Sequence, residues 1–246
     1  MKKLFLLLLP FLLLTSCDKD DDNYSLDHYW VDIATLNNPD NSSFFFFTLD
    51  DSTRLWTAAS ALKYYRPKDG QRAIVNYTIL NDKPASSGYN HDVKLNDVYE
   101  VLTKNIFNLT PATADSIGND YITIEDIWIG SNFLNVEFVY QGGHKIHYIN
   151  LVSDNSKTYT DGKIHLEFRH NSNGDYPSIY RWGMVSFNLK SLQVAGKNAV
   201  DIVIHTKEFS TGNSNRTYNF TYKYGASSSR SVNRTIKIPL NPALMR

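Results

Sequence analysis

Residues 121–152 read YITIEDIWIGSNFLNVEFVYQGGHKIHYINLV, and this stretch decides the fold class. Its β-branched and aromatic residues form short runs, as in neighbouring β-strands. Gly130-Ser131-Asn132 and Gly142-Gly143 interrupt these runs and predict two hairpin turns. The turns join three expected strands: Tyr121–Ile129, Phe133–Tyr140 and Lys145–Val152. We therefore expect antiparallel β structure here.

The same pattern continues toward the C-terminus. Five more short runs are expected as strands: Lys163–Arg169, Met184–Leu189, Val200–Phe209, Arg216–Tyr224 and Thr235–Pro239. About eight strands with hairpin-like turns indicate an antiparallel β-sandwich, which we place at residues 120–246.

The N-terminal half is also rich in strand signals. Five strands are expected: Tyr29–Leu36, Phe44–Leu49, Arg54–Thr57, Arg72–Leu80 and Val93–Thr103. Asp50-Asp51-Ser52 predicts a turn, and apolar residues at helical spacing predict one short helix at Ala58–Tyr65. Five strands with one helix fit a closed barrel of the OB type. We place this barrel at residues 28–115, with the domain boundary in Asn105–Asn119. The predicted fold class is therefore all-β.

The first residues form an export signal. Lys2 and Lys3 precede an apolar run, Leu4–Leu14, that is too short to span a bilayer. The run ends in Leu-Thr-Ser-Cys, which resembles a bacterial lipobox and implies cleavage before Cys17 and lipid attachment to its thiol. Cys17 is the chain's one cysteine, so lipidation leaves no thiol for disulfides, metal sites or catalysis. We expect a signal peptide at residues 1–16 and an acidic tether at residues 17–27.

Charge argues against one class of partner. Removing Lys2 and Lys3 leaves 23 basic residues against 25 acidic ones, a formal net charge of −2. A nearly neutral protein has no bulk attraction for nucleic acid. The expected partners are therefore the membrane, through the lipid on Cys17, and a glycan or protein ligand.

Several blocks resemble one protein family, the NigD-like lipoproteins of the Bacteroidota. They are YSLDHYWVDI (24–33), LWTAAS (55–60), PKDGQRAIVNYTIL (67–80), DIWIGSNFLNVEF (126–138), YINLV (148–152), LEFRHN (166–171) and FNLKSL (187–192). LWTAAS departs from the family's frequent LWPAAS, and Gly225–Arg246 shows little resemblance. The resemblance implies an OB domain followed by a β-sandwich. It also implies an association with bacteriocin immunity, but it supplies no catalytic residues.

The residues after Cys17 are expected to act as a surface-export signal. Asp18, Lys19, Asp20, Asp21 and Asp22 resemble an export signal that the Bacteroidota use for surface lipoproteins. The alternatives are a solvated tether without an address and, on the pattern of enteric bacteria, retention at the inner membrane by the first Asp. We expect a protein anchored in the outer membrane and facing the cell exterior, or alternatively the periplasm.

Motifs for catalysis, metals and cofactors are not found in the sequence. It contains no G-x-S-x-G, H-E-x-x-H or phosphate-binding glycine loop. Glu125 and Asp126 point to opposite faces of a strand, so they cannot flank one glycosidic bond. Asn171–Asp175 predicts an Asn-Gly turn rather than a calcium loop. We expect no enzyme, no cofactor and no metal.

The histidines of the second half are weighed as metal ligands. His144, His147, His165 and His170 lie in two neighbouring expected strands. His147 and His165 are the pair that can meet across a sheet. Because no spacing typical of metal ligands accompanies them, ordinary hydrogen-bonded histidines are favoured.

The binding candidates are aromatic and basic. Trp56, Tyr64, Tyr65 and Arg66 suit stacking on sugars or contact with a protein. For the stretch that holds Tyr64, Tyr65 and Arg66, base stacking on single-stranded nucleic acid is a further alternative, and an ordinary solvated loop is the favoured interpretation. Phe44–Phe47 is expected to be covered on both faces, inside the barrel and against the second domain. The alternative for this run is an exposed aromatic platform.

The predicted function is a non-enzymatic, surface-exposed binding lipoprotein. A bacteriocin-immunity protein and a carboxylate-dependent glycan hydrolase are the alternatives, and the hydrolase requires carboxylates that meet only in the folded chain.

Overall fold

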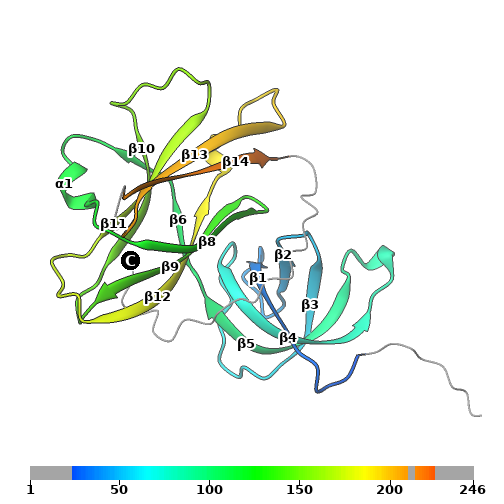
Figure 1. The fold of residues 1–246 in the computed structure, drawn as a ribbon. Helices are drawn as coiled ribbons and strands as arrows, with labels where there is room; N and C mark the ends of the chain where they lie inside the picture. Colours follow the sequence, from blue (N-terminus) through cyan, green and yellow to red (C-terminus); the bar gives the residue numbers. More distant parts are fainter. Residues whose placement is uncertain (1–23, 210–213, 225–246) are drawn as a thin grey trace, which may run out of the picture.

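The computed structural model describes residues 24–209 and 214–224, which form a barrel and a sandwich (Figure 1). Cys17, the residues Asp18–Asp22 and the predicted strand Thr235–Pro239 lie outside the described residues.

The N-terminal half is a closed five-stranded barrel in the order β1-β2-β3-β5-β4. Its strands are β1 (Trp30–Asn37), β2 (Phe46–Leu49), β3 (Arg54–Ser60), β4 (Arg72–Asp82) and β5 (His91–Glu100). Alternate residues such as Leu36, Phe47, Leu55 and Leu95 fill the barrel interior. The predicted OB-type barrel is confirmed.

Of the two local predictions in the barrel, the turn is confirmed and the helix is wrong. The Asp50-Asp51-Ser52 turn is confirmed, with Ser52 at a φ of 75° between β2 and β3. The helix predicted at Ala58–Tyr65 is wrong, because β3 continues to Ser60 and pairs in parallel with β5. Pairing with a strand distant in sequence overrides the local helical spacing. A short 3-10 helix, η1 (Ala85–Ser87), lies instead between β4 and β5.

The second half is a sandwich of two sheets. The five-stranded sheet has the order β14-β13-β11-β10-β7, and the four-stranded sheet has the order β6-β12-β9-β8. Their strands are β6 (Leu102–Asn105), β7 (Phe107–Leu109), β8 (Thr123–Gly130), β9 (Phe133–Gly142), β10 (Tyr148–Asp154), β11 (Ile164–Asn171), β12 (Ile179–Asn188), β13 (Ala199–Lys207) and β14 (Asn215–Lys223). Two helical turns, α1 (Ala114–Ile117) and η2 (Lys190–Leu192), lie in connections.

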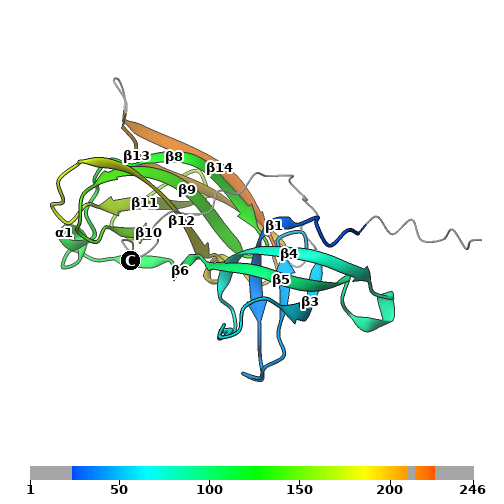
Figure 2. The same ribbon diagram turned by 90° about the horizontal axis from the view of Figure 1, so that it is seen from below.

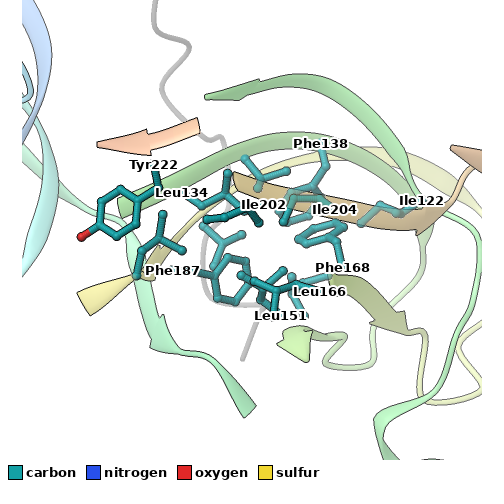
Figure 3. Close-up of a cluster of buried hydrophobic side chains, with 14 of the residues drawn as sticks. Ile122, Leu134, Phe138, Leu151, Leu166, Phe168, Phe187, Ile202, Ile204 and Tyr222 are labelled. Atoms are coloured by element: carbon teal, nitrogen blue, oxygen red, sulfur yellow. The ribbon is translucent and has the colours of Figure 1, made fainter. Parts of the chain in front are cut away.

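The sandwich core is apolar and continuous. Leu134 and Phe138 from one sheet meet Leu151, Phe168 and Ile204 from the other (Figure 3). The predicted sandwich is confirmed, but its pairing is not purely antiparallel. β6 pairs in parallel with β12, β7 with β10, and β11 with β13.

One of the two predicted hairpins in residues 121–152 is wrong. β8 and β9 form the hairpin around Gly130-Ser131-Asn132, as predicted. β10 does not pair with β9, because it lies in the opposite sheet. Gly142 is needed for another reason: a Cβ there would lie 2.8 Å from Nε2 of His147. The chain therefore crosses between the sheets at Gly142-Gly143.

The link between the domains is short. The strand predicted at Val93–Thr103 breaks at Val101 into β5 in the barrel and β6 in the sandwich. Val101 is buried among apolar residues of both domains, at the point where the chain passes from one to the other. The structure thus places β6 and β7 in the sandwich sheets, although we expected the barrel domain to extend to residue 115.

The barrel and the sandwich lie side by side (Figure 2), and buried side chains of both pack together where they meet. Ile33 and Ile74 of the barrel pack with Trp128 and Met184 of the sandwich. Arg72 lies beside this apolar contact, fully buried, and its two terminal nitrogens lie 2.8 Å and 3.0 Å from the Asp50 carboxylate.

Sandwich residues complete this ion pair. Arg72 also donates to Oδ1 of Asn135 at 3.2 Å, and its guanidinium lies 4.7 Å from the ring centroid of Phe133. A Cβ on Gly130 would lie only 1.8 Å from the Asp50 carboxylate, so only glycine fits there. We call Arg72, Asp50, Asn135, Phe133 and Gly130 the interdomain lock.

Candidate functional site

Aromatic side chains gather on the outside of the barrel. Phe44 comes from the connection between β1 and β2, Phe46 from the start of β2, Trp56 from β3 and Tyr89 from the connection between β4 and β5. Arg54 of β3 lies among them. We call these five residues the aromatic face.

The rings of the aromatic face contact one another in sequence. The ring of Phe44 stacks on Trp56 with centroids 6.4 Å apart and planes within 11°. Trp56 contacts Tyr89 at 4.9 Å, and Tyr89 contacts the edge of Phe46 at 5.2 Å. Phe44 is 71% exposed, whereas the other rings are half-buried. The result is a row of contacting rings in which Phe44 is the most exposed.

Strand alternation produces this arrangement. Phe45 and Phe47 point into the barrel, so Phe44 and Phe46 point outward. Phe46 lies directly opposite Trp56 in the β2–β3 pairing, which brings their side chains to one face. The expectation that Phe44–Phe47 is covered on both faces is therefore wrong for Phe44. The alternative, an exposed aromatic platform, describes the outward residues.

The basic group of the face is held by its neighbours. The guanidinium of Arg54 lies 4.5 Å from the ring centroid of Phe46 and 4.9 Å from that of Tyr89. The Arg54 backbone N–H donates to Oδ1 of Asn90, and the Asn90 N–H donates to the Arg54 carbonyl, both at 2.8 Å. These bonds join β3 to the β4–β5 connection and bring Tyr89 onto the face.

The structure divides the four binding candidates of the sequence. Trp56 lies in the aromatic face, but no ring contact joins it to Tyr64 or Tyr65 in the described part of the chain. Tyr64 is 91% exposed in the loop after β3, and Arg66 is exposed in the same loop. Tyr65 packs on Phe45 at the barrel core, and burial raises the pKa of its hydroxyl.

The sequence reasoning missed Arg54 and Tyr89 as site residues. Outward alternation of Phe44 and Phe46 was visible in the sequence. The approach of Tyr89 depends on the barrel closing and had no sequence signal.

The sandwich contains a buried histidine cluster. His147 and His170 stack with ring centroids 5.0 Å apart, and Nδ1 of His147 lies 2.7 Å from Nε2 of His170. Nε2 of His147 lies 3.1 Å from the Asp175 carboxylate, and Nδ1 of His170 lies 2.9 Å from the Tyr121 carbonyl. Both histidines are at most 2% exposed.

Counting protons shows what this cluster requires. The Asp175 carboxylate and the Tyr121 carbonyl only accept, so the three hydrogen bonds need three ring protons. Two neutral imidazoles carry two protons, so the neutral pair is one proton short of satisfying all three bonds. Burial lowers the pKa of His170 to about 4, which keeps that ring neutral. Desolvation opposes ionisation of Asp175, but hydrogen bonds from His147 and backbone N–H groups outweigh it and lower its pKa.

A second histidine pair lies toward the surface of the five-stranded sheet. Nδ1 of His165 lies 2.8 Å from Nε2 of His205, and Nε2 of His165 lies 3.0 Å from Asp161. Two neutral rings satisfy both bonds. His147 therefore meets His170 and not His165, so the candidate metal-binding pair does not form, and the favoured alternative of hydrogen-bonded histidines describes the rings of both pairs. Within the residues that the structure describes, no three His, Cys, Asp or Glu side chains are arranged to hold a metal ion.

The Asn-Gly turn and the buried carboxyl group of Asp32 are the remaining candidates for a metal or catalytic site. Asn173 and Gly174 have φ values of 55° and 60°, so the predicted Asn-Gly turn is confirmed, and it positions Asp175. Burial raises the pKa of Asp32, whose carboxylate accepts from the Tyr77 hydroxyl at 2.8 Å. The carboxylate of Asp50 forms an ion pair with Arg72. This arrangement does not provide the two cooperating carboxylates that glycoside hydrolysis needs.

Comparison with protein families settles the relationship of the chain. Residues 33–101 match the NigD-like N-terminal OB domain, and residues 105–222 match the NigD-like C-terminal β-sandwich domain. The chain belongs to the NigD-like family. A search of curated proteins finds no match to it.

Solved structures resemble this NigD-like chain along most of its length. A toxin-related protein from Parabacteroides distasonis is 34% identical, with a TM-score of 0.68 over 80% of this chain and 95% of that one. A protein of unknown function from Bacteroides vulgatus is 28% identical, with a TM-score of 0.71 over 89% of this chain and 100% of that one. A NigD-like immunity protein from Bacteroides caccae is 18% identical, with a TM-score of 0.63 over 81% and 99%, and shares the fold.

The position of the aromatic face within the NigD-like OB domain is informative. Phe46, Arg54 and Trp56 lie on β2 and β3, and Phe44 and Tyr89 lie in the β1–β2 and β4–β5 connections. Barrels of this type bind oligosaccharides and oligonucleotides on these two strands and these two connections.

Proposed function

We propose that this NigD-like protein is a non-enzymatic lipoprotein of the cell envelope that binds a glycan on the aromatic face of its barrel. One observation carries the proposal: the exposed stack of Phe44 on Trp56, next to Arg54, lies where OB barrels bind ligands. Rigid rings with accessible faces bind sugars at low entropic cost, since little side-chain freedom remains to be lost.

In this proposal, a lipid on Cys17 anchors the protein to the membrane. No helix within residues 24–209 and 214–224 is long and apolar enough to cross a membrane. Three acyl chains, as in mature bacterial lipoproteins, hold a protein in a bilayer stably. We propose that the protein is attached to the outer membrane and faces the cell exterior. We further propose that residues Asp18–Asp22 act as the surface-export signal.

Two variants separate the anchor from the address. Cys17→Ala should abolish mature lipoprotein, because no other thiol exists in the sequence. Replacing Asp20, Asp21 and Asp22 with Ala should keep lipidation and reduce shaving by protease on intact cells. If the triple variant is shaved as readily as wild type, the acidic run is only a tether.

A glycan array and a pull-down from cell extracts, both with residues 24–246, test the binding role. Trp56→Ala should lower the retention of any ligand by at least about tenfold, the typical cost of losing a central aromatic contact. Tyr176→Ala, at a 78% exposed tyrosine of the sandwich, is the matched control and should change nothing. If no glycan is retained, or if both variants behave alike, the proposal fails.

A protein partner is the second candidate. Similar solved structures are described as a NigD-like immunity protein and a toxin-related protein. Trp, Tyr and Arg, which form much of the aromatic face, are also the residue types that dominate binding energy at protein interfaces. Deleting the gene and challenging the cells with the product of the neighbouring operon tests this role. Unchanged sensitivity would exclude it.

A further inference from the structure

We infer that the aromatic face selects acidic glycans, with a carboxylate or sulfate group of the sugar on Arg54 and the sugar ring on Phe44 and Trp56. This inference rests on the proposed glycan binding and adds the charge of the ligand to it.

Arg54 is a fixed cation without a counter-ion. In residues 24–209 and 214–224, no carboxylate lies within 4.0 Å of its guanidinium nitrogens. The rings of Phe46 and Tyr89 lie against the guanidinium, and backbone bonds to Asn90 hold its strand. Less side-chain entropy is therefore lost when this guanidinium meets an anion.

Carboxylates near the face are already paired. Asp92 lies 2.8 Å from Nζ of Lys83, and Asp82 lies 2.6 Å from Nδ1 of His91. These pairs satisfy the acidic residues that border the β4–β5 connection, so they are not drawn to Arg54. An anion for Arg54 must then come from a ligand.

The planar guanidinium also matches the shape of the group. It offers parallel N–H donors that bind a carboxylate or sulfate through two hydrogen bonds, a stronger contact than a neutral hydroxyl provides. The stacked ring of Trp56, on the same strand two residues away, faces the same side as Arg54. A sugar ring and its acidic substituent can therefore be bound together.

The test compares probes that differ in charge alone, using the full mature chain purified in detergent. The probes are polygalacturonate against its fully methyl-esterified form, and dextran sulfate against dextran. We expect at least one acidic probe to bind about 10- to 100-fold more tightly than its neutral counterpart, the range for a charge-assisted contact. Raising the salt concentration should weaken the binding of the acidic form more than that of the neutral form.

Variants assign the charge preference to one residue. Arg54→Gln should abolish the preference, and Arg54→Lys should retain part of it. Arg216→Gln, at an exposed arginine of β14, is the matched control and should keep the wild-type preference. Equal binding of the acidic and neutral forms, or a preference that survives Arg54→Gln, overturns the inference and leaves glycan binding intact. Binding of neither form of either pair overturns the inference and counts against the proposed function itself.

Discussion

Two arginines of this protein lie over aromatic rings, and they differ in whether a carboxylate of the protein pairs with them. Arg72 lies over Phe133 with its guanidinium fully buried, paired with Asp50 and bonded to Asn135. Arg54 lies over Phe46 and Tyr89 on the barrel surface, where the described residues provide no carboxylate. The protein supplies a carboxylate to the first cation and none to the second, for which we propose an anionic ligand.

This difference distinguishes the structural role of Arg72 from the binding role that we propose for Arg54. An arginine with a buried carboxylate partner holds two domains together, and removing either partner leaves an uncompensated charge. An arginine with only rings around it costs little to leave unpaired, because its remaining N–H groups face water. The histidine cluster of the sandwich belongs with Arg72, since the fold supplies the partners of its rings.

Breaking the interdomain lock should give the largest effect on stability. Arg72→Ala leaves Asp50 and Asn135 without their cation, so we expect the free energy of unfolding to fall by about 3–5 kcal/mol. Urea denaturation followed by tryptophan fluorescence measures it. Arg54→Ala is the matched control, with an expected loss below about 1 kcal/mol. Similar losses for the two arginines would contradict the comparison.

Lowering the pH should destabilise the sandwich through His170. The pKa of His170 is about 4 in the folded chain because of burial, below the ordinary value of 6.5. Between these values the unfolded chain binds a proton that the folded chain does not, so stability falls as the pH drops through this range. We expect a loss on the order of 3 kcal/mol between pH 7 and pH 4.

The pH profile has internal controls. The pKa of Asp175 is lowered, so its contribution is lost only below pH 3.8, under this window. The pKa of Asp32 is raised by burial, so that residue opposes the trend near the acid end. His170→Gln should flatten the profile measured by urea denaturation, and an unchanged slope would show that His170 is not its source.

Crowding the lock should cost less than removing its cation. Gly130→Ala places a Cβ against the Asp50 carboxylate and forces that side chain to move, which should destabilise the protein by about 1–3 kcal/mol. Gly130 does not have a positive φ, so backbone strain does not contribute and the loss reports the contact with Asp50. A wild-type melting temperature for Gly130→Ala in thermal unfolding would mean that no steric conflict with Asp50 exists.

Truncating the aromatic face should have the smallest effect on stability and the largest on binding. Trp56→Ala removes a half-buried outward ring, so we expect about 1 kcal/mol of destabilisation or less. Ligand retention should fall in the same variant, while Arg72→Met should keep it wherever the protein stays folded. Calorimetric unfolding combined with a binding assay on each variant checks both halves. A stable Trp56→Ala protein that retains its ligand would show that the aromatic face is not the binding site.

The sequence predicted the parts of this fold that depend on local pattern. Alternation placed most strands of both domains but missed β7, which lies in the stretch expected to be the domain boundary. Small polar residues marked the turns at Asp50–Ser52 and Gly130–Asn132. Gly142-Gly143 was misinterpreted because a two-residue turn and a crossing between sheets look the same until the partner strand is known. The helix predicted at Ala58–Tyr65 failed for a similar reason, since pairing with β5 decides its conformation.

The candidate site was predictable in part. Trp56 and the outward alternation of the Phe44–Phe47 run were visible in the sequence. Arg54 and Tyr89 were not, because barrel closure brings the β4–β5 connection to β3. The pairing of His147 with His170 likewise depends on how β10 and β11 align.

Hydrogen–deuterium exchange with and without a bound glycan tests the central claim most directly. The account predicts that ligand slows exchange in residues 44–48, 54–57 and 88–91, which carry the aromatic face, and leaves the sandwich unchanged. Slower exchange confined to the sandwich, or around Arg72 without any change at Arg54, would contradict it.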